Sequence, residues 1–393
     1  MDIVKNPNID WLGLKWIFVS ISLILMVIAG VSVALIGLHL GVDFTGGTLV
    51  HVKFKEEPQL ERIRETLSEA ALKAEEVVRF DELSLNEVQI RMASVEGEET
   101  QDVTLGSNQI FEALRQEYDQ SQSETGKLDL NNVSRSALSA RLQELNPENS
   151  SQEQPISEST EYYRELADKI IDYRTEQSGM IQDFSELDPL GIPTAVVETL
   201  REESYLGSFT VISVESVGPK VGQEMRTRAR NAVGFSLVGM LIYIAVRFWP
   251  IYGFAALVAL FHDVFITVGI FSLTGREISL TVVAALLTLV GYSINDTIVV
   301  FDRVRENLRL MRRDDLGTII NTSINQTLNR TIMTSGMTFL AVFSLYLFGG
   351  QVLQGFSFAL VVGIIVGTYS SVAIASPIVL WWQNYLDRKK ARS

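Results

Sequence analysis

The sequence has no cysteine and only three histidines among its 393 residues. The absence of cysteine excludes disulfides, thiolate metal sites and cysteine nucleophiles, and the histidines are too scattered to suggest a zinc site. No G-x-x-x-x-G-K-[ST] segment occurs, so nothing indicates a nucleotide site. We therefore expect no metal, no cofactor, no catalytic residue and no enzymatic activity.

The hydrophobic residues, 47% of the chain, are gathered into long runs. The first run, 16–38, contains no charge, and about 20 apolar residues suffice to cross a bilayer. A cleaved signal peptide is the alternative, but the run is long for an h-region and no A-x-A-like site follows it. The runs predict a polytopic α-helical membrane protein with six transmembrane helices, at 16–38, 232–248, 251–273, 280–301, 331–348 and 353–382.

The basic residues favour a multi-pass topology with both termini in the cytoplasm. Most lysines and arginines near the spans fall on the side predicted to be inside, while Arg276 lies in a short outer loop. The arginines at 226, 228 and 230 lie outside, but in a long translocated domain, where the rule is weak. The expected parts are a cytoplasmic N-terminus at 1–15, an external domain at 39–230, membrane segments at 231–301 and 331–382, and a basic cytoplasmic tail at 383–393.

Residues 39–230, the external domain, hold 37 acidic and 19 basic side chains, whereas the remainder of the chain carries a charge of +4. The overall net charge of -14 therefore comes from this domain and not from the membrane part. Alternating apolar residues predict strands near 48–54 and 88–92, and a buried strand is expected at 209–214. Helical spacing follows Pro58, and a second helix is expected to start near Pro193. These elements predict an α/β domain of ferredoxin-like type.

Residues 94–189 are rich in Gln, Glu, Ser and Asn and contain several helical stripes, which predicts a helical insert in the external domain. The insert is either a surface for a partner or unfolded client, or a solvated decoration with a small core of its own. Downstream, Gly218, Pro219 and Gly222 interrupt regular structure and predict a hinge to the second span. A rigid turn is the alternative there.

The stretch 291–303 places the carboxylate of Asp296 inside a predicted span, about 7 to 8 Å from its cytoplasmic end at the helical rise. A buried ionisable group in a membrane is costly and indicates function, although a structural polar contact is the alternative. A small or polar stripe on this span is expected to point into the bundle, with Ser293, Asp296 and Thr297 beside it. Its members are Ala284, Thr288, Gly291 and Asn295.

Arg330 and Thr334 share a face of the fifth span, and their depth allows Arg330 to meet Asp296. An interface anchor whose charged end reaches the headgroups is the alternative for Arg330. His262 and Asp263 form a second apolar-flanked polar pair without an obvious partner. Residues 302–330 predict amphipathic helices on the cytoplasmic surface, with their apolar face toward lipid. On the last span small residues recur every four positions and predict close helix packing. They include Gly355, Ala359, Gly363 and Gly367.

Four stretches resemble the SecF family of protein-export membrane subunits, within the resistance-nodulation-division superfamily. They are 41–48 with its Gly46-Gly47 pair, 217–225, 291–303 and 329–331. The resemblance covers all six spans, whereas the 94–189 insert departs from the shorter external domain typical of the family.

The resemblance implies an accessory subunit of the Sec translocase in the bacterial cytoplasmic (inner) membrane. Such a subunit works with SecD and the SecYEG translocon on unfolded preprotein, with protons as the coupling ion. Asp296 then matches the proton-linked carboxylate and Arg330 the arginine of the same relay, while a further carboxylate is expected from SecD. Membrane lipid is the remaining partner, and no nucleic acid is expected. Half of a related small-molecule or lipid exporter, or a non-transporting translocon scaffold, stays open as an alternative.

Overall fold

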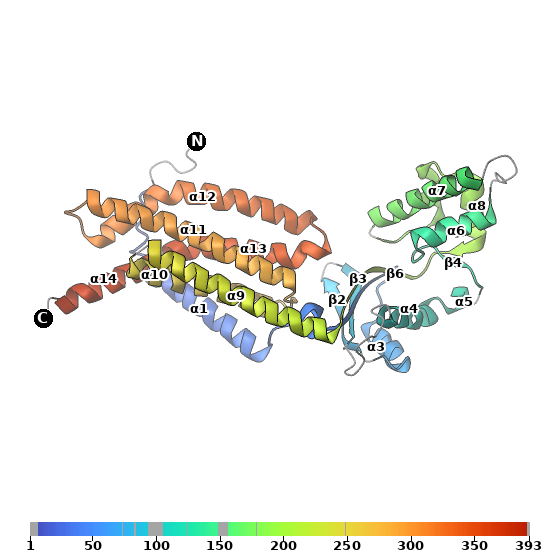
Figure 1. Ribbon diagram of the computed structural model, residues 1–393, viewed down its shortest axis with the longest axis horizontal. Helices are drawn as coiled ribbons and strands as arrows, with labels where there is room; N and C mark the ends of the chain where they lie inside the picture. Colours follow the sequence, from blue (N-terminus) through green and yellow to red (C-terminus); the bar gives the residue numbers. More distant parts are fainter. Residues whose placement is uncertain are drawn as a thin grey trace. The chain divides into compact units, whose positions relative to one another are not determined.

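The computed structural model describes residues 7–72, 74–81, 84–92, 105–123, 125–147, 156–177, 179–247 and 249–390 (Figure 1). The chain divides into two compact units. A helical unit contains Met1–Phe44 and Glu224–Ser393, and an α/β unit contains Thr45–Gln223. The predicted start of the insert at residue 94 lies outside the described residues.

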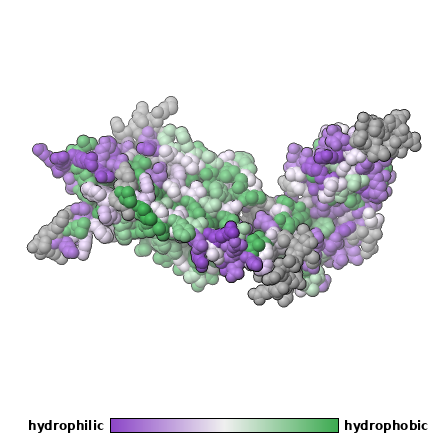
Figure 2. Space-filling view, in the orientation of Figure 1, coloured by the Kyte–Doolittle hydropathy of each residue, from purple (hydrophilic) through white to green (hydrophobic). Residues whose placement is uncertain are grey.

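Within the described residues, five helical segments are long and apolar enough to cross a membrane. They are α1 Lys15–Leu35, α10 Pro250–Leu273, α11 Leu280–Leu310, α12 Leu316–Phe348, and the run Val352–Leu386. That run passes through α13 Gln351–Ser370, a π-helical turn at Ser371–Ala375 and α14 Ser376–Lys390. The predicted second span lies in α9 Pro219–Arg247, which is not among the five. Figure 2 shows a largely hydrophobic surface over the helical unit, as lipid contact requires.

Small residues bring α1 and α10 into unusually close contact. A Cβ placed on Gly269 of α10 would lie 2.2 Å from the Cβ of Ala29 and 2.6 Å from its Cα. In a membrane, helices associate mainly by such packing, because lipid tails are as apolar as the side chains that they replace. The α1–α10 contact therefore depends on the missing side chain at Gly269.

Residues 302–330 do not form separate surface helices, which corrects the prediction for that segment. They are the end of α11 and the beginning of α12, and the turn between them ends at Asp315, whose carboxylate accepts from the backbone N–H of Thr318 at 3.0 Å. Val304, Ile320 and Ile324 are buried in the main core of the helical unit instead of facing lipid. An apolar stripe shows that one face is covered, but not whether lipid or protein covers it.

The segment before α1 is fixed to α12 by two amides, Asn325 and Asn321, of which Asn321 Oδ1 accepts from Trp11 N at 2.8 Å. The Oδ1 atom of Asn325 accepts hydrogen bonds from Ile9 N at 3.2 Å and from Trp11 Nε1 at 3.1 Å. Its Nδ2 atom donates to Ile9 O at 2.9 Å. Asn325 thus satisfies the backbone of Ile9 in the way that a neighbouring strand would.

The α/β unit is built on a four-stranded antiparallel sheet of order β2-β3-β1-β6. Helices α3 and α4 and the inward side chains of the sheet share one core, which includes Val52, Phe54, Leu67 and Leu114. The chain order is therefore strand, helix, strand, strand, helix, strand. The elements are β1 Gly47–Phe54, α3 Leu60–Glu69, β2 Ala74–Asp81, β3 Ser84–Met92, α4 Leu105–Tyr118 and β6 Phe209–Val217.

The packing divides the unit differently from the predicted 94–189 insert. Helix α4 joins the core of the sheet, whereas α8, which was predicted to belong to the sheet domain, packs in the second core through Val196 and Leu200. The second core otherwise belongs to the elements between α4 and α8. Amphipathic spacing predicts that a helix is half-buried, but it does not say which of two cores the helix joins. The elements between α4 and β6 are α5 Gln120–Ser123, β4 Leu128–Asp129, α6 Arg135–Leu145, α7 Ile156–Glu176, the 3-10 helix Phe184–Leu190, α8 Thr194–Glu203 and β5 Ser204–Tyr205.

The inserted elements leave and return to the sheet domain at one neck. Directly after α4, both carboxylate oxygens of Asp119 accept from the backbone N–H of Ser208 at 3.1 Å, just before β6. Asn132 of the insert donates to Phe209 O at 2.8 Å. Asp129 lies beside this neck, where burial raises its pKa although Asn132 and two backbone N–H groups donate to it. The entry and exit of the insert are thus held side by side.

The two connections between the α/β and helical units also meet. Gly46 and Gly47 have φ of +74° and +116°, which favour glycine, and Gly47 pairs with Val217 across β1 and β6. A Cβ on Gly46 would lie 3.0 Å from the Cα of Pro219, the residue at which α9 begins. The predicted hinge residues Gly218 and Gly222 flank this point, and the division between the units falls after Gln223.

Candidate functional site

Asp296 is buried between three helices of the helical unit. Its side chain is on α11 and only 2% exposed. Ser335 of α12 donates a hydrogen bond to its Oδ2 at 2.8 Å, and Thr368 of α13 lies beside it. Asp296 belongs to the buried face of α11, which repeats at helical spacing. That face includes Val282, Ala285, Leu289, Ser293, Asp296 and Val300.

Arg330 interacts with Asp296 electrostatically across space, not by direct contact. The side chain of Arg330 is exposed on α12, and within the described part of the chain no ion pair joins the two residues. Thr334, predicted as a supporting residue, is also exposed, and its hydroxyl bonds to its own helix at Arg330 O. The adjacent Ser335 makes the contact instead. Sequence reasoning missed Ser335 because its position on the buried face of α12 depends on the rotation of that helix.

The small or polar stripe predicted to point into the bundle does not do so in this chain. All of its members on α11 are exposed. Ser293 and Thr297, by contrast, are buried, and Thr297 donates to Ser293 O at 3.4 Å. The prediction assumed that small and polar residues face the interior of the helix bundle. In the structure the apolar residues at 282, 285 and 289 mark the buried face of α11 instead. The exposed residues are Ala284, Thr288, Gly291 and Asn295.

Asp263 has partners that the sequence did not reveal. It is fully buried on α10, and His262 Nδ1 lies 2.9 Å from its Oδ1. Ser293 of α11 and Ser370 of α13 donate to its Oδ2 at 2.5 and 2.7 Å. A buried carboxylate is tolerated when such donors satisfy it. The two serines come from helices far apart in sequence, so no local pattern could pair them with Asp263.

The small face of α13 lies against α11. A Cβ on Gly363 would lie 2.5 Å from the Leu289 side chain, and one on Gly355 would lie 3.1 Å from Val282. Ala359 is fully buried in the same contact region. At Gly367 an added Cβ would lie 3.2 Å from Ser293 and 3.5 Å from the Asp263 carboxylate. This glycine therefore gives the buried polar groups the space in which they meet.

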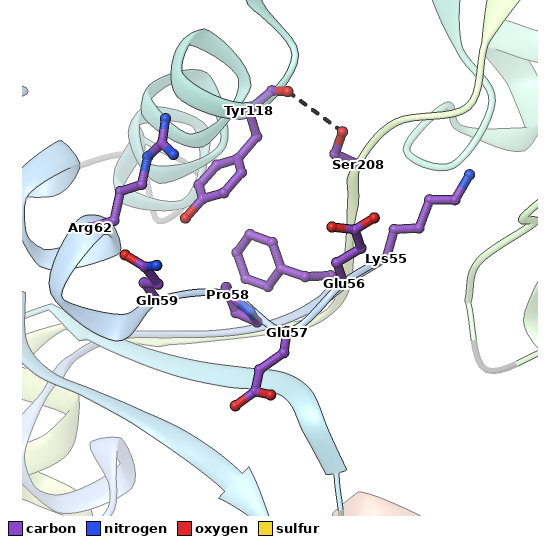
Figure 3. Close-up of a pocket in the computed structure, with 9 residues that line it drawn as sticks. Lys55, Glu56, Glu57, Pro58, Gln59, Arg62, Tyr118 and Ser208 are labelled. Carbon is purple, nitrogen blue, oxygen red and sulfur yellow. Dashed lines mark hydrogen bonds between the residues drawn. The ribbon is translucent and has the colours of Figure 1, made fainter.

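The α/β unit contains a hollow of about 410 Å³ beside α3 (Figure 3). Arg62 and Gln59 lie on one side of it and Lys55 and Glu56 on the other. Arg62 stacks over the Tyr118 ring, 5.7 Å from its centroid, and forms an ion pair with Glu117. Charges of both signs line the hollow, which gives no preference for an anionic or a cationic ligand. We assign it no function.

Comparison with known proteins identifies the family. A model of the SecD/SecF C-terminal region of protein export membrane proteins matches residues 196–385, and a model of the SecD/SecF GG motif matches 31–57. The SecF protein translocase subunit of Koribacter versatilis is 45% identical over 98% of this chain and 94% of its own. That of Calditerrivibrio nitroreducens is 35% identical over 96% of both chains. The chain belongs to the SecF family.

The SecF assignment agrees with the solved structures. A crystal structure of SecDF, a translocon-associated membrane protein from Thermus thermophilus, matches with a TM-score of 0.64 and 30% identity. The match covers 96% of this chain and 39% of that one. SecDF in its super-membrane-facing form gives a TM-score of 0.54 over the whole of this chain. The protein is thus a SecF-type accessory subunit of protein translocation with a SecDF-like fold, which is consistent with the resistance-nodulation-division superfamily.

Proposed function

We propose that this chain works with SecD at the SecYEG translocon and uses the proton motive force to drive export of unfolded preprotein. The observation that carries the proposal is Asp296, a carboxylate that is buried in the membrane part and surrounded by α11, α12 and α13. Intramembrane ionisable residues are rare and mark functional sites, among them ion pathways and proton relays. The ligand of the site is the proton itself, with no other cofactor.

The proposed step is protonation of Asp296. In the charged state the carboxylate attracts Arg330 of α12 and accepts from Ser335. Addition of a proton removes the negative charge, so the attraction to Arg330 disappears and α12 is free to shift against α11. The α/β unit would respond about the hinge at Gly218, Pro219 and Gly222, where its two connections meet.

The energetic requirement can be estimated. A charge that crosses the membrane potential gains about 2.3 kcal/mol per 100 mV. To move a two-state equilibrium from 1:99 to 99:1 requires about 5.5 kcal/mol. At about 100 mV, roughly two to three protons are therefore needed for a complete switch. One carboxylate in this chain, together with the further carboxylate expected from SecD, would supply about 4.6 kcal/mol, which is most of that requirement.

We propose that SecD contacts this chain at the exposed small or polar stripe of α11. Thr288 and Asn295 face outward on a helix that crosses the membrane, and Arg330 and Thr334 are exposed on the neighbouring α12. Polar and small side chains are favoured at contacts between membrane helices rather than against lipid. A SecD helix on this surface would bring its own carboxylate toward Arg330.

The proposed arrangement has six spans in the bacterial inner membrane and both termini in the cytoplasm. Helix α9 supplies the sixth span, because the uncharged part of its C-terminal half is long enough to approach bilayer thickness. The α/β unit is then external, and its sheet order with two helices on one face supports a ferredoxin-like domain. Preprotein that emerges from the translocon would meet this domain.

The test compares Asp296→Asn with Asp302→Asn, which removes an exposed carboxylate from the same helix. Both variants replace the resident copy in cells, and export of a secreted reporter is measured with and without a protonophore. We expect Asp296→Asn to lose the protonophore-sensitive part of export and Asp302→Asn to retain it. Undiminished protonophore-sensitive export in Asp296→Asn would refute proton coupling through this residue and would favour a scaffold role.

A further inference from the structure

His262 and Asp263 form a buried titratable pair that the mechanism above does not use. They lie on α10, with exposed fractions of 2% and 0%. Asp263 accepts from Ser293 of α11 and Ser370 of α13, so three helices contribute to the cluster. Among the described residues, a further titratable group close to the pair is Tyr369 of α13, whose ring centroid lies 6.4 Å from that of His262. The Tyr369 hydroxyl is directed to α1, where it donates to Phe18 O at 2.7 Å.

The hydrogen bonds define the protonation chemistry of His262. A charged Asp263 accepts from Nδ1–H, which leaves Nε2 of the neutral ring as a free acceptor. Among the residues that the structure describes, no group hydrogen-bonds to this buried Nε2 atom. The ring therefore has one basic nitrogen available for a proton, and the neighbouring carboxylate can balance the resulting charge.

The pair lies one helical turn from the Asp296 site on two shared helices. Ser293, which binds Asp263, precedes Asp296 by three residues on α11. On α13, Gly367 lies against Asp263 and the next residue, Thr368, lies beside Asp296. Directly after Ser370 the helix changes to a π-helical turn at Ser371–Ala375, a feature that is frequent at functional sites. The two buried acids are thus connected through the same short segments.

We propose that the His262–Asp263 pair is a second proton-binding site in the membrane part of this chain, displaced from Asp296 toward the Leu280 end of α11. The proton binds to the Nε2 lone pair, the ring becomes an imidazolium ion, and Asp263 remains a carboxylate. Release of the same proton from Nε2 restores the neutral ring. This inference rests on the proposed proton coupling, to which it adds a second proton within one subunit.

Two variants separate proton binding from a purely structural polar contact. His262→Asn keeps an amide that can donate to Asp263 but cannot take up a proton near neutral pH. Asp263→Asn keeps the size of the side chain and an oxygen that accepts from Ser293 or Ser370, but removes the balancing charge. Asp302→Asn is again the exposed control on α11. Thermal unfolding of each variant in lipid nanodiscs identifies any that fails to fold.

The first measurement is direct and does not depend on export. The full chain in liposomes is titrated between pH 5 and 9, and infrared difference spectra record imidazole ring bands. His39 and His51 contribute imidazole bands in every variant, so the His262 signal is read as a difference between variants. We expect one component of the wild-type ring signal to be lost in His262→Asn and displaced in Asp263→Asn, but retained in Asp302→Asn. A His262→Asn spectrum identical to that of the wild type would overturn the proposal.

The second measurement tests whether the His262–Asp263 pair is needed for proton-driven export. In the export assay described above, we expect His262→Asn and Asp263→Asn to lose protonophore-sensitive export to the same extent as Asp296→Asn. If Asp296→Asn loses it while both folded variants retain it, the second site is refuted and the proposed function stands. If all three retain it, the proposed function fails as well.

Discussion

Gly269→Ala tests the closest helix contact in the membrane part. The added Cβ would lie 2.2 Å from Ala29 Cβ and 2.6 Å from its Cα, whereas carbon atoms in contact are about 3.5–4.0 Å apart. The deficit of roughly 1.5 Å cannot be relieved by a change of rotamer, because a backbone atom and its own Cβ are the obstacles. Helices α1 and α10 must therefore move apart.

The expected cost follows from two opposing effects. Overpacking costs about 1–3 kcal/mol, and the upper part of that range applies because the backbone must shift. Alanine favours the helix over glycine by about 1 kcal/mol. The net destabilisation is therefore about 2 kcal/mol, which corresponds to a change of roughly 30-fold in the unfolding equilibrium.

The assay is reversible unfolding of the full chain in lipid nanodiscs. Gly336→Ala on α12 is the matched control, because nothing lies within 4 Å of the added Cβ, and it should be neutral or slightly stabilising. In the double variant, Ala29→Gly removes the nearer obstacle, the Cβ at 2.2 Å, but leaves the Cα at 2.6 Å, so it should restore only part of the loss. If Gly269→Ala and Gly336→Ala have the same stability, the close approach of α1 and α10 does not exist.

Three further predictions concern other contacts. Ser335→Ala should reduce protonophore-sensitive export, because Asp296 loses the hydrogen bond that Ser335 donates. Thr334→Ala is the control and should leave export unchanged, because Thr334 bonds to its own helix. Equal effects of the two substitutions would contradict the site geometry. Asn325→Ala should free the backbone of Ile9, while Asn321 still holds Trp11, and should increase amide hydrogen exchange at Ile9 by more than tenfold, given about 1.5 kcal/mol per lost hydrogen bond. Hydrogen bonding from His51 lowers the pKa of Glu87 in the folded protein. The charged Glu87 therefore stabilises the sheet at pH values above its unfolded pKa of about 4.3, and this stabilisation is lost as the pH falls through the lower folded pKa. Glu87→Gln should therefore weaken the acid dependence of amide protection in β1 and β3, and an unchanged dependence would exclude this pair as its source.

The sequence predicted much of the fold because the signals were local. Runs of apolar residues located the membrane helices to within a few residues at most ends, and alternation located β1 and β3. What could not be predicted was which surface an amphipathic element would meet. For this reason α4 and α8 were predicted to join the wrong cores. For the same reason the apolar face of the segment 302–330 was predicted to contact lipid, whereas it packs in the core of the helical unit.

In the candidate site, too, the features that depend on local sequence could be predicted and those that depend on tertiary packing could not. Asp296 could be selected from sequence because a carboxylate in an apolar run is costly wherever it points. Ser335, the hydrogen-bond donor to Asp296, could not be selected from sequence. Thr334 and Ser335 differ by only about 100° around α12, and the packing of the helix decides which of the two is buried. Asp263 appeared to lack a partner for the same reason, because Ser370 is more than 100 residues away in the chain.

The neck formed by Asp119 and Ser208 has a practical and an evolutionary consequence. Because the chain departs and returns at adjacent points, the segment 120–207 can be exchanged as a cassette without moving either end of the sheet domain. A short turn at this position should leave a minimal domain, and a fluorescent protein with neighbouring termini should be accepted there as a reporter. Lineages could likewise have gained or enlarged this segment in a single step, while the strands on either side kept their register.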